Sequence, residues 1–431
     1  MGNRKINLNV PFITRVEGEG ALTLTASGND IEKLHLQIFE PPRLFERFLV
    51  GKSYQEVPDL SARICGICPM AYQLTSILAM ESLFEVTLPT CLQELRLLMN
   101  VGEWLQSHAL HIHFLAMPDY YGFDSALQMA PHHPDLLKRG MQIQEAGNAL
   151  MRLLGGRSVH PVGLQVGGFS TLPTPQAWEH ARKQVNDAIT AVNALFNWAA
   201  ELTLPDYAHP FTSVSLSGEG TYPINGGAIS IDGKALLRHE DYASHFKEHQ
   251  VSHSTALYSL FDGQDYLVGP LARMNNNFSQ LPEKVRAMAT RAGVTFPSHN
   301  MFDSVRARAL ECVWALQTAQ EILQQDCPVG DAHVPYTVTE GECCYCTEAP
   351  RGLIYHHYQI DDAGKVVSCR IIPPTSQNQA RIEKDLKQAL HRFGMDKADD
   401  DIKRFCEQVI RNYDPCISCS THFLDLTVLR R

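Results

Sequence analysis

The chain has 431 residues, of which 44% are hydrophobic and 19% charged, and its formal net charge is −10 at pH 7. This length and composition support a large buried core and exclude an intrinsically disordered chain. The acidic balance argues against a nucleic-acid partner, because such binders carry a basic surface. We find no apolar leader and no apolar run of membrane-spanning length, so we expect a cytoplasmic protein with no membrane segment.

The chain opens with a strand pattern that changes to helical periodicity. Residues 21–26 and 34–38 alternate apolar and polar side chains around a turn at 27–30, which predicts a β-hairpin. A helix is predicted to begin at Pro69. Further long helices are predicted over 91–116, 136–154, 174–201 and 302–325. The remaining predicted elements are strands and loops over 205–270 and 334–373, and helices over 379–394 and 398–411.

The sequence contains no internal repeats and no linker-like segment that would separate two domains. We therefore expect an α+β fold, built as one large domain with a central bundle of long helices and small peripheral β-sheets. This domain covers residues 1–422. Residues 423–431 form a C-terminal tail that is a candidate for removal during maturation.

Two Cys-x-x-Cys pairs, Cys65 with Cys68 and Cys416 with Cys419, carry the most chemical information. Thiolates are soft ligands that select transition metals over Mg²⁺ or Ca²⁺. A zinc ribbon normally places its second pair within about 20 residues of the first. The wide spacing favours a four-sulfur site assembled by the whole domain, with four thiolates around zinc as the alternative. Twelve cysteines without a secretory context favour ligands and buried thiols over disulfides.

The motifs around these pairs are Arg-x-Cys-Gly-x-Cys at 63–68 and Asp-Pro-Cys-x-x-Cys-x-x-His at 414–422. Together they resemble the signatures of the large catalytic subunit of [NiFe] hydrogenases, and the resemblance extends over nearly the whole chain. The segment Ile-Cys-Gly-Ile-Cys-Pro-Met-Ala-Tyr-Gln at 64–73 and the short length are similar to the cytoplasmic NAD(P)-linked, sulfhydrogenase-like branch. The resemblance implies reversible interconversion of H₂ with protons and electrons.

The resemblance also implies the roles of the four cysteines. Cys65 and Cys416 would be terminal nickel ligands. Cys68 and Cys419 would bridge nickel to an iron that also carries CO and two cyanides.

Two carboxylates and a histidine receive roles from the same resemblance. Glu17, in Thr-Arg-Val-Glu-Gly, matches the proton-transfer glutamate, although a lone carboxylate is more often an exposed surface group. Glu46, at the end of Glu-Pro-Pro-Arg-Leu-Phe-Glu, and His422 would bind Mg²⁺.

The motif Glu-Ala-Pro-Arg-Gly at 348–352 resembles the loop that holds a guanidinium, here Arg351, over the open face of the metal. A fixed cation there would orient cyanide ligands and polarise H₂. Asp119 and Asp414 correspond to carboxylates that fix this arginine, and helix capping is the alternative for both. Additional groups placed near the cyanides are Pro350, Thr375 and Ser376.

Some features depart from the family pattern. Tyr72 stands where many relatives carry His. Cys343, Cys344 and Cys346 precede Arg351 and are either further ligands or small buried thiols, of which the second is the commoner case.

No further cluster motif and no dinucleotide fingerprint is evident, so electrons must leave through partners. The resemblance implies an iron–sulfur small subunit, flavin and NAD(P) diaphorase subunits, and a maturation protease that cuts after His422. The alternatives are an H₂-sensing regulatory subunit and a metal-free, quinone-reductase-like relative. The intact pairs of cysteines argue against the metal-free relative.

Overall fold

The computed structural model describes residues 4–218 and 220–421. His422, which was predicted as a Mg²⁺ ligand and as the site of processing, lies outside the described residues. The tail at 423–431 also lies outside them.

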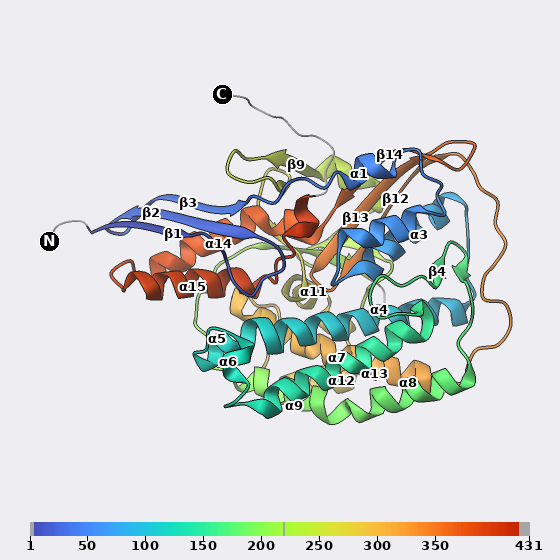
Figure 1. Cartoon of the computed structure of the whole chain (residues 1–431), viewed down its shortest axis with the longest axis horizontal. Coiled ribbons are helices and arrows are strands. Elements are labelled where there is room, and N and C mark those ends of the chain that lie inside the picture. The colour runs from blue at the N-terminus through green and yellow to red at the C-terminus, as the bar shows by residue number, and fades with distance from the viewer. Residues whose placement is uncertain (1–3, 219, 422–431) are drawn as a thin grey trace.

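The described strands form five small sheets around a body of helices (Figure 1). In sheet order the strands are β1 (Lys5–Val10), β2 (Gly20–Ser27) and β3 (Asp30–Ile38); β4 (Leu164–Gln165) and β5 (Gly168–Phe169); β11 (Tyr266–Leu267), β6 (Thr212–Ser217), β7 (Ala228–Ile231) and β8 (Ala235–Leu237); β10 (Leu257–Phe261) and β9 (Phe246–Gln250); and β12 (Gly341–Ala349), β13 (Gly352–Ile360) and β14 (Val366–Ile372). The α-helices are α1 (Phe45–Leu49), α2 (Val57–Ser61), α3 (Pro69–Leu83), α4 (Thr90–Leu110), α5 (Met117–Tyr121), α6 (Ala126–Met129), α7 (Pro134–Gly155), α8 (Pro175–Asp187), α9 (Ile189–Glu201), α10 (Tyr242–His245), α11 (Pro270–Asn277), α12 (Glu283–Arg291), α13 (Ser304–Leu323), α14 (Pro374–Phe393) and α15 (Asp399–Asn412). The predicted α+β class is confirmed.

The long helices α4, α7, α8, α9 and α13 lie together in one layer, and most of the sheets lie on the other side of α4 (Figure 1). Helix α4 continues through a π-helical turn, η2 (His111–Ala116), into α5. Helices α4 and α7 approach closely because both carry glycine at the crossing. A Cβ atom built on Gly147 would lie 2.5 Å from the carbonyl oxygen of Gly102. The bundle is therefore held together by backbone-to-backbone packing as well as by apolar side chains.

The predicted N-terminal hairpin is confirmed as β2 and β3, with β1 added as a third antiparallel strand. The apolar faces of these strands pack against α14 and α15, which form a second hydrophobic core. The sheet and the C-terminal helices thus lie side by side, although they come from opposite ends of the sequence (Figure 1).

Two helix predictions were wrong in detail, and some short helices were not predicted. The segment predicted as one helix over 174–201 is two helices, α8 and α9, separated at Ala188. The short helices α11 and α12 were not predicted, because their few turns carry little periodic signal. Helix α14 begins at Pro374 rather than near 379, because a proline at the first helical position lacks only a donor that the helix does not use.

Four separate chain segments meet where the two Cys-x-x-Cys pairs lie. Residue Glu17 forms an isolated parallel β-bridge with Cys416, and the backbone N–H of Arg43 donates to the carbonyl of Thr421 at 2.6 Å. All the paired cysteines belong to the main hydrophobic core. In the part of the chain that the structure describes, no helix is both long enough and apolar enough to cross a membrane.

Candidate metal centre

The first cysteine pair lies in the loop between a short 3-10 turn, η1 (Ala62–Ile64), and the N-terminus of α3. Cys65 Sγ accepts hydrogen bonds from the backbone N–H groups of Ile67 at 3.3 Å and Cys68 at 3.1 Å. The Cys68 thiol donates to Cys65 Sγ at 3.0 Å, and both side chains are buried. The loop therefore directs both sulfurs to one point.

The electrostatics of this pair favour a thiolate at Cys65. Burial alone would raise the pKa of Cys65, but the hydrogen bond from Cys68 and the charge of Arg351 outweigh it, and the pKa is lowered. The hydrogen bond to Cys65, together with burial, raises the pKa of Cys68. A buried pair of thiols in which one pKa is lowered is suited to binding a metal cation.

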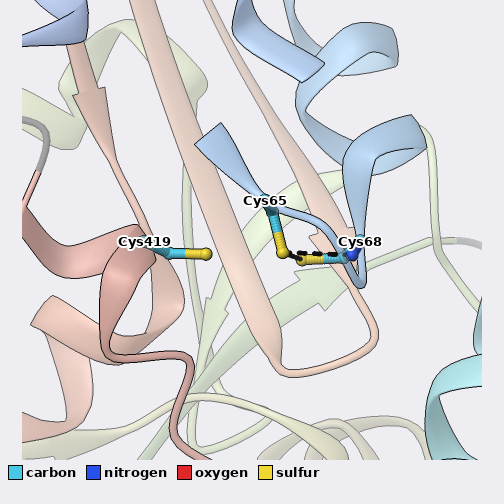
Figure 2. Close-up of side chains that lie close together, drawn as sticks. All are labelled: Cys65, Cys68 and Cys419. Carbon is cyan, nitrogen blue, oxygen red and sulfur yellow. Dashed lines mark hydrogen bonds between the residues drawn. The ribbon is translucent and has the colours of Figure 1, made fainter. Parts of the chain in front are cut away.

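The second cysteine pair follows α15 and lies partly in η6 (Ser418–Thr421). Cys416 Sγ lies 3.6 Å from Cys65 Sγ, and the sulfurs of Cys65, Cys68 and Cys419 can face one common point (Figure 2). The structure joins Cys416 to Cys419 as a disulfide. Metal binding requires both in the thiolate form. The structure thus gathers four buried sulfurs from the two ends of the chain.

Glu17 is the carboxylate nearest to these sulfurs. Its Oε2 lies 3.0 Å from Cys416 Sγ and accepts the backbone N–H of Ser418 at 3.2 Å. Its carbonyl accepts the N–H of Ile417 at 2.9 Å. The next residue, Gly18, has a φ of +86°, and a Cβ there would lie 2.8 Å from the Cβ of Ile417. A glycine is therefore needed for Glu17 to approach the second cysteine loop.

Arg351 and Asp414 form a buried ion pair beside the sulfurs. Arg351 Nε donates to the carbonyl of Asp414 at 2.8 Å, and Nη2 donates to its Oδ1 at 3.0 Å. Burial opposes ionisation of Asp414, but the Arg351 charge outweighs it and lowers the pKa of this carboxyl. Arg351 Nη1 is buried with no hydrogen-bond partner among the described residues. It offers a free donor to a polar group bound at the site.

Asp119 does not share this arginine. Its Oδ2 accepts from Arg411 Nε at 2.8 Å, and its Oδ1 is bonded by both Arg15 and Arg411. The structure thus shows no pairing of Asp119 with Arg351, and a role for Asp119 at the site stays a prediction. Asp119 reaches the site only indirectly, because the Arg411 carbonyl accepts the backbone N–H of Asp414 at 3.0 Å.

The early start of α14 places two predicted hydroxyls in its first turn. Thr375 Oγ1 accepts the backbone N–H of Cys416 at 2.9 Å, which leaves its own O–H able to donate elsewhere. Ser376 is buried beside it. The carbonyl of Pro350, on the loop that carries Arg351, accepts a hydrogen bond from Arg273 at 2.9 Å.

Glu46 lies on α1, where it is 7% exposed. Its Oε1 accepts the backbone N–H of Ile371 at 2.8 Å, so one oxygen is committed to β14. Its expected partner in cation binding, His422, is outside the described residues.

Two residues at the site were missed by sequence reasoning. Arg43 Nη2 donates to the carbonyls of Ile64, at 2.6 Å, and Ser418, and so links the two cysteine loops. Glu103 accepts the backbone N–H groups that open α3 directly after Cys68, and burial raises its pKa to about 8. Arg43 lies inside a motif that was already singled out, whereas Glu103 gave no local signal within its helix.

The two departures from the family pattern have different outcomes. Tyr72 is fully buried, and its hydroxyl has no hydrogen-bond partner among the described residues. Burial, together with Cys68 and Cys65, raises the pKa of this tyrosine. Cys343 packs in the main core, whereas Cys346 lies in the core beneath β6 and β7 and Cys344 packs against that second core, so Cys343 points away from the other two.

Comparisons with known proteins identify the family and the fold. A profile of the family described as nickel-dependent hydrogenase matches residues 43–144 and 231–422. The chain is 32% identical to sulfhydrogenase 2 subunit alpha of Pyrococcus furiosus, over 96% of this chain and 98% of that protein. It is 26% identical to the NAD-reducing hydrogenase HoxS subunit beta of Cupriavidus necator, over 96% and 94% of the two chains. The solved structure of an NAD⁺-reducing [NiFe]-hydrogenase in the H₂-reduced state has the same fold, with a TM-score of 0.90, 24% identity and coverage of 98% and 100%.

Proposed function

Because the chain belongs to the nickel-dependent hydrogenase family, we propose that it is the catalytic large subunit of a [NiFe] hydrogenase that interconverts H₂ with two protons and two electrons. The observation that carries the proposal is the buried cluster of sulfurs from Cys65, Cys68, Cys416 and Cys419. Family membership favours nickel and iron over the zinc alternative.

The donor set fits a nickel–iron centre. In this proposal Cys65 and Cys416 would hold nickel, and Cys68 and Cys419 would hold both nickel and iron. All four are buried, soft sulfur donors, which suits these metals. When bound, the centre supplies the redox-active site at which H₂ is split. Cyanides on the iron would accept hydrogen bonds, and Arg351 Nη1, which has no partner among the described residues, offers one donor for them.

Glu17 is proposed to carry protons to and from the centre. Its Oε2 lies 3.0 Å from Cys416 Sγ, within the distance at which a sulfur-bound proton passes directly to a carboxylate. The backbone N–H of Ser418 donates to the same oxygen and holds it in this position.

Arg351 is proposed to hold a fixed positive charge over the substrate. Its fork is oriented by two bonds to Asp414, and a planar guanidinium keeps its remaining donor in a defined direction. The hydroxyls of Thr375 and Ser376 and the turn at Pro350 are proposed to complete the polar surroundings of the cyanides. Asp119 acts at a distance, through Arg411.

Glu46 and His422 are proposed to bind Mg²⁺. A carboxylate with several waters suits this ion.

The remaining assignments concern partners. Family membership implies an electron-accepting small subunit, proposed to contain iron–sulfur clusters, with flavin subunits that reduce NAD(P) in the cytoplasm. A maturation protease is proposed to cut after His422. Intact-mass measurement on active enzyme tests the cut, because a fully active subunit that still ends in Arg431 would contradict it.

The test of the proposed function is isotope exchange between H₂ and D₂O by the purified enzyme complex, together with its infrared spectrum. We expect exchange that tracks nickel content, and bands from iron-bound CO and CN. A zinc-containing complex with neither exchange nor these bands would contradict the proposal.

A further inference from the structure

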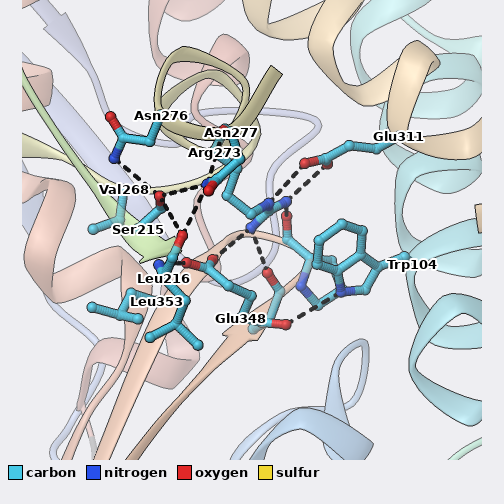
Figure 3. A network of polar contacts seen from close by, with 12 residues as sticks. Trp104, Ser215, Leu216, Val268, Arg273, Asn276, Asn277, Glu311, Glu348 and Leu353 are labelled. Atoms are coloured by element: carbon cyan, nitrogen blue, oxygen red, sulfur yellow. Dashed lines mark hydrogen bonds and ion pairs between the residues drawn. The ribbon is translucent and has the colours of Figure 1, made fainter. Parts of the chain in front are cut away.

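A completely buried charge network lies directly behind the loop that carries Arg351 (Figure 3). Its centre is Arg273, on α11. Arg273 Nη1 donates to the carbonyl of Ala349 at 2.9 Å, and Nη2 donates to the carbonyl of Pro350 at 2.9 Å. One planar fork therefore holds both peptide groups that precede Arg351.

Glu311, on α13, fixes Arg273 in turn. Its two carboxylate oxygens accept Arg273 Nε at 2.7 Å and Nη2 at 2.8 Å. Glu311 also accepts the Tyr222 hydroxyl at 2.7 Å, and its Oε2 lies 2.8 Å from His108 Nε2. The guanidinium of Arg273 additionally stacks over Trp104, at 4.1 Å from the ring centroid. The fork thus has no freedom to rotate away from the loop.

The backbone of the loop is held just as closely. Gly269 precedes α11, and a Cβ there would lie 2.7 Å from the carbonyl oxygen of Arg351. Gly352 has a φ of +140°, and a Cβ there would lie 2.7 Å from Val268 Cγ2. Both positions require glycine, so the segment at 268–273 and the turn at 349–352 pack with backbone in direct contact.

A buried ionic network is not the most stable way to fill this volume, because well-packed apolar residues often match or exceed the stability of buried ion pairs. Its distinguishing property is the fixed direction of its hydrogen bonds. The tip of Arg351 is anchored by Asp414, and its backbone is anchored by Arg273. Two anchors at opposite ends of one side chain determine where the guanidinium points.

We propose that Arg273 and Glu311 are positioning residues for the catalytic reaction, and that they act by setting the position of the Arg351 guanidinium at the metal centre. This inference rests on the proposed function. It assigns a role to a network that touches none of the four cysteines.

A double-mutant cycle on the purified complex separates this role from a general loss of structure. Arg273→Lys keeps the charge but cannot bond both carbonyls and Glu311 with a planar fork. We expect it to lower H₂/D₂O exchange by about 10²-fold, the effect of a small misplacement of a catalytic group. In an Arg351→Lys background the same change should lower exchange no further than about threefold.

The matched control is Arg96→Lys. Arg96 forms a two-bond pair with Glu81 at 2.6 Å that is also buried, but its other partner is the carbonyl of Gln165 rather than the loop of Arg351. Arg96→Lys should lower thermal stability as much as Arg273→Lys while leaving exchange per bound nickel unchanged. Equal losses of H₂/D₂O exchange in Arg273→Lys and Arg96→Lys would overturn the proposal. It would also be overturned if Arg273→Lys lowered exchange by the same factor in the Arg351→Lys background as in the wild type.

Two further readouts do not depend on turnover. Amide hydrogen exchange of residues 349–352 should accelerate in Arg273→Lys and not in Arg96→Lys, and the infrared bands of the iron-bound diatomic ligands should shift in the same variant. If Arg273→Lys does not accumulate, Tyr222→Phe replaces it, since it removes one donor to Glu311; it should produce the same shifts on a smaller scale. If neither the amide hydrogen exchange of residues 349–352 nor the infrared bands change, the proposal is overturned. Wild-type enzyme without exchange would instead contradict the proposed function.

Discussion

Replacing Glu17 with Gln separates proton transfer from metal binding. The amide has nearly the shape of the carboxylate, and its oxygen can still accept the backbone N–H of Ser418. The backbone bond from Ile417 to the carbonyl of residue 17 is unaffected. We therefore expect Glu17→Gln to fold, to bind nickel at the wild-type level and to lose about 1 kcal/mol of stability at most, the value of one weakened hydrogen bond.

The effect on catalysis should be far larger. Glu17 Oε2 is 3.0 Å from Cys416 Sγ, and an amide in its place cannot accept a proton from that sulfur. General acid–base catalysis by a positioned side chain contributes about 10²–10⁴-fold. Exchange of H₂ with D₂O should fall by that factor, which corresponds to a barrier increase of about 2.7–5.4 kcal/mol.

The assay is mass-spectrometric exchange between H₂ and D₂O, expressed per bound nickel. Glu19→Gln is the matched control, because Glu19 is two residues away, is exposed and directs only its backbone N–H, at 2.7 Å, to Glu40. It should exchange at the wild-type rate. Wild-type exchange in Glu17→Gln with full nickel would refute the assignment and require another proton route.

Three other predictions test the structure away from this proton step. Gly147→Ala should lower the unfolding temperature of the complex, because the new Cβ would lie 2.5 Å from the Gly102 carbonyl oxygen. Such overpacking typically costs about 1–3 kcal/mol of stability. An unchanged unfolding temperature would contradict the packing of α4 on α7. Burial, with Arg139 adding to it, lowers the pKa of His113 to about 3, so the stability due to its neutral form is complete above pH 6.5 and is lost as the pH falls towards 3. His113→Gln should therefore reduce the slope of the free energy of unfolding against pH by about 1.4 kcal/mol per pH unit in that range. An unaltered slope would contradict burial of the neutral ring. Glu46→Gln should reduce Mg²⁺ in metal analysis while nickel is retained, and undiminished Mg²⁺ would remove Glu46 from the proposed cation site.

The sequence was most informative where chemistry is local. The spacing within each cysteine pair, the glycine after Glu17 and the proline that begins α3 are each explained by neighbouring residues. The long helices were also predictable, because a sustained apolar stripe survives tertiary packing. The break at Ala188 between α8 and α9 was not predictable, since nothing in the local pattern requires it.

Contacts between distant segments were beyond sequence reasoning. Asp119 was expected at Arg351, but its partners Arg15 and Arg411 come from opposite ends of the chain. The Arg273–Glu311 pair gave no signal either, because a charged residue in a helix is usually exposed and only the packing of α11 against α13 buries both.

The most direct test of the central claim is nickel content per subunit in four single variants, Cys65→Ser, Cys68→Ser, Cys416→Ser and Cys419→Ser. Cys312→Ser is the control, since this thiol is also buried in the main core but is not one of the four clustered sulfurs. We predict near-stoichiometric nickel in the wild type and the control, and loss of nickel together with H₂/D₂O exchange in all four variants. Stoichiometric nickel with full exchange in Cys419→Ser would contradict the four-sulfur centre.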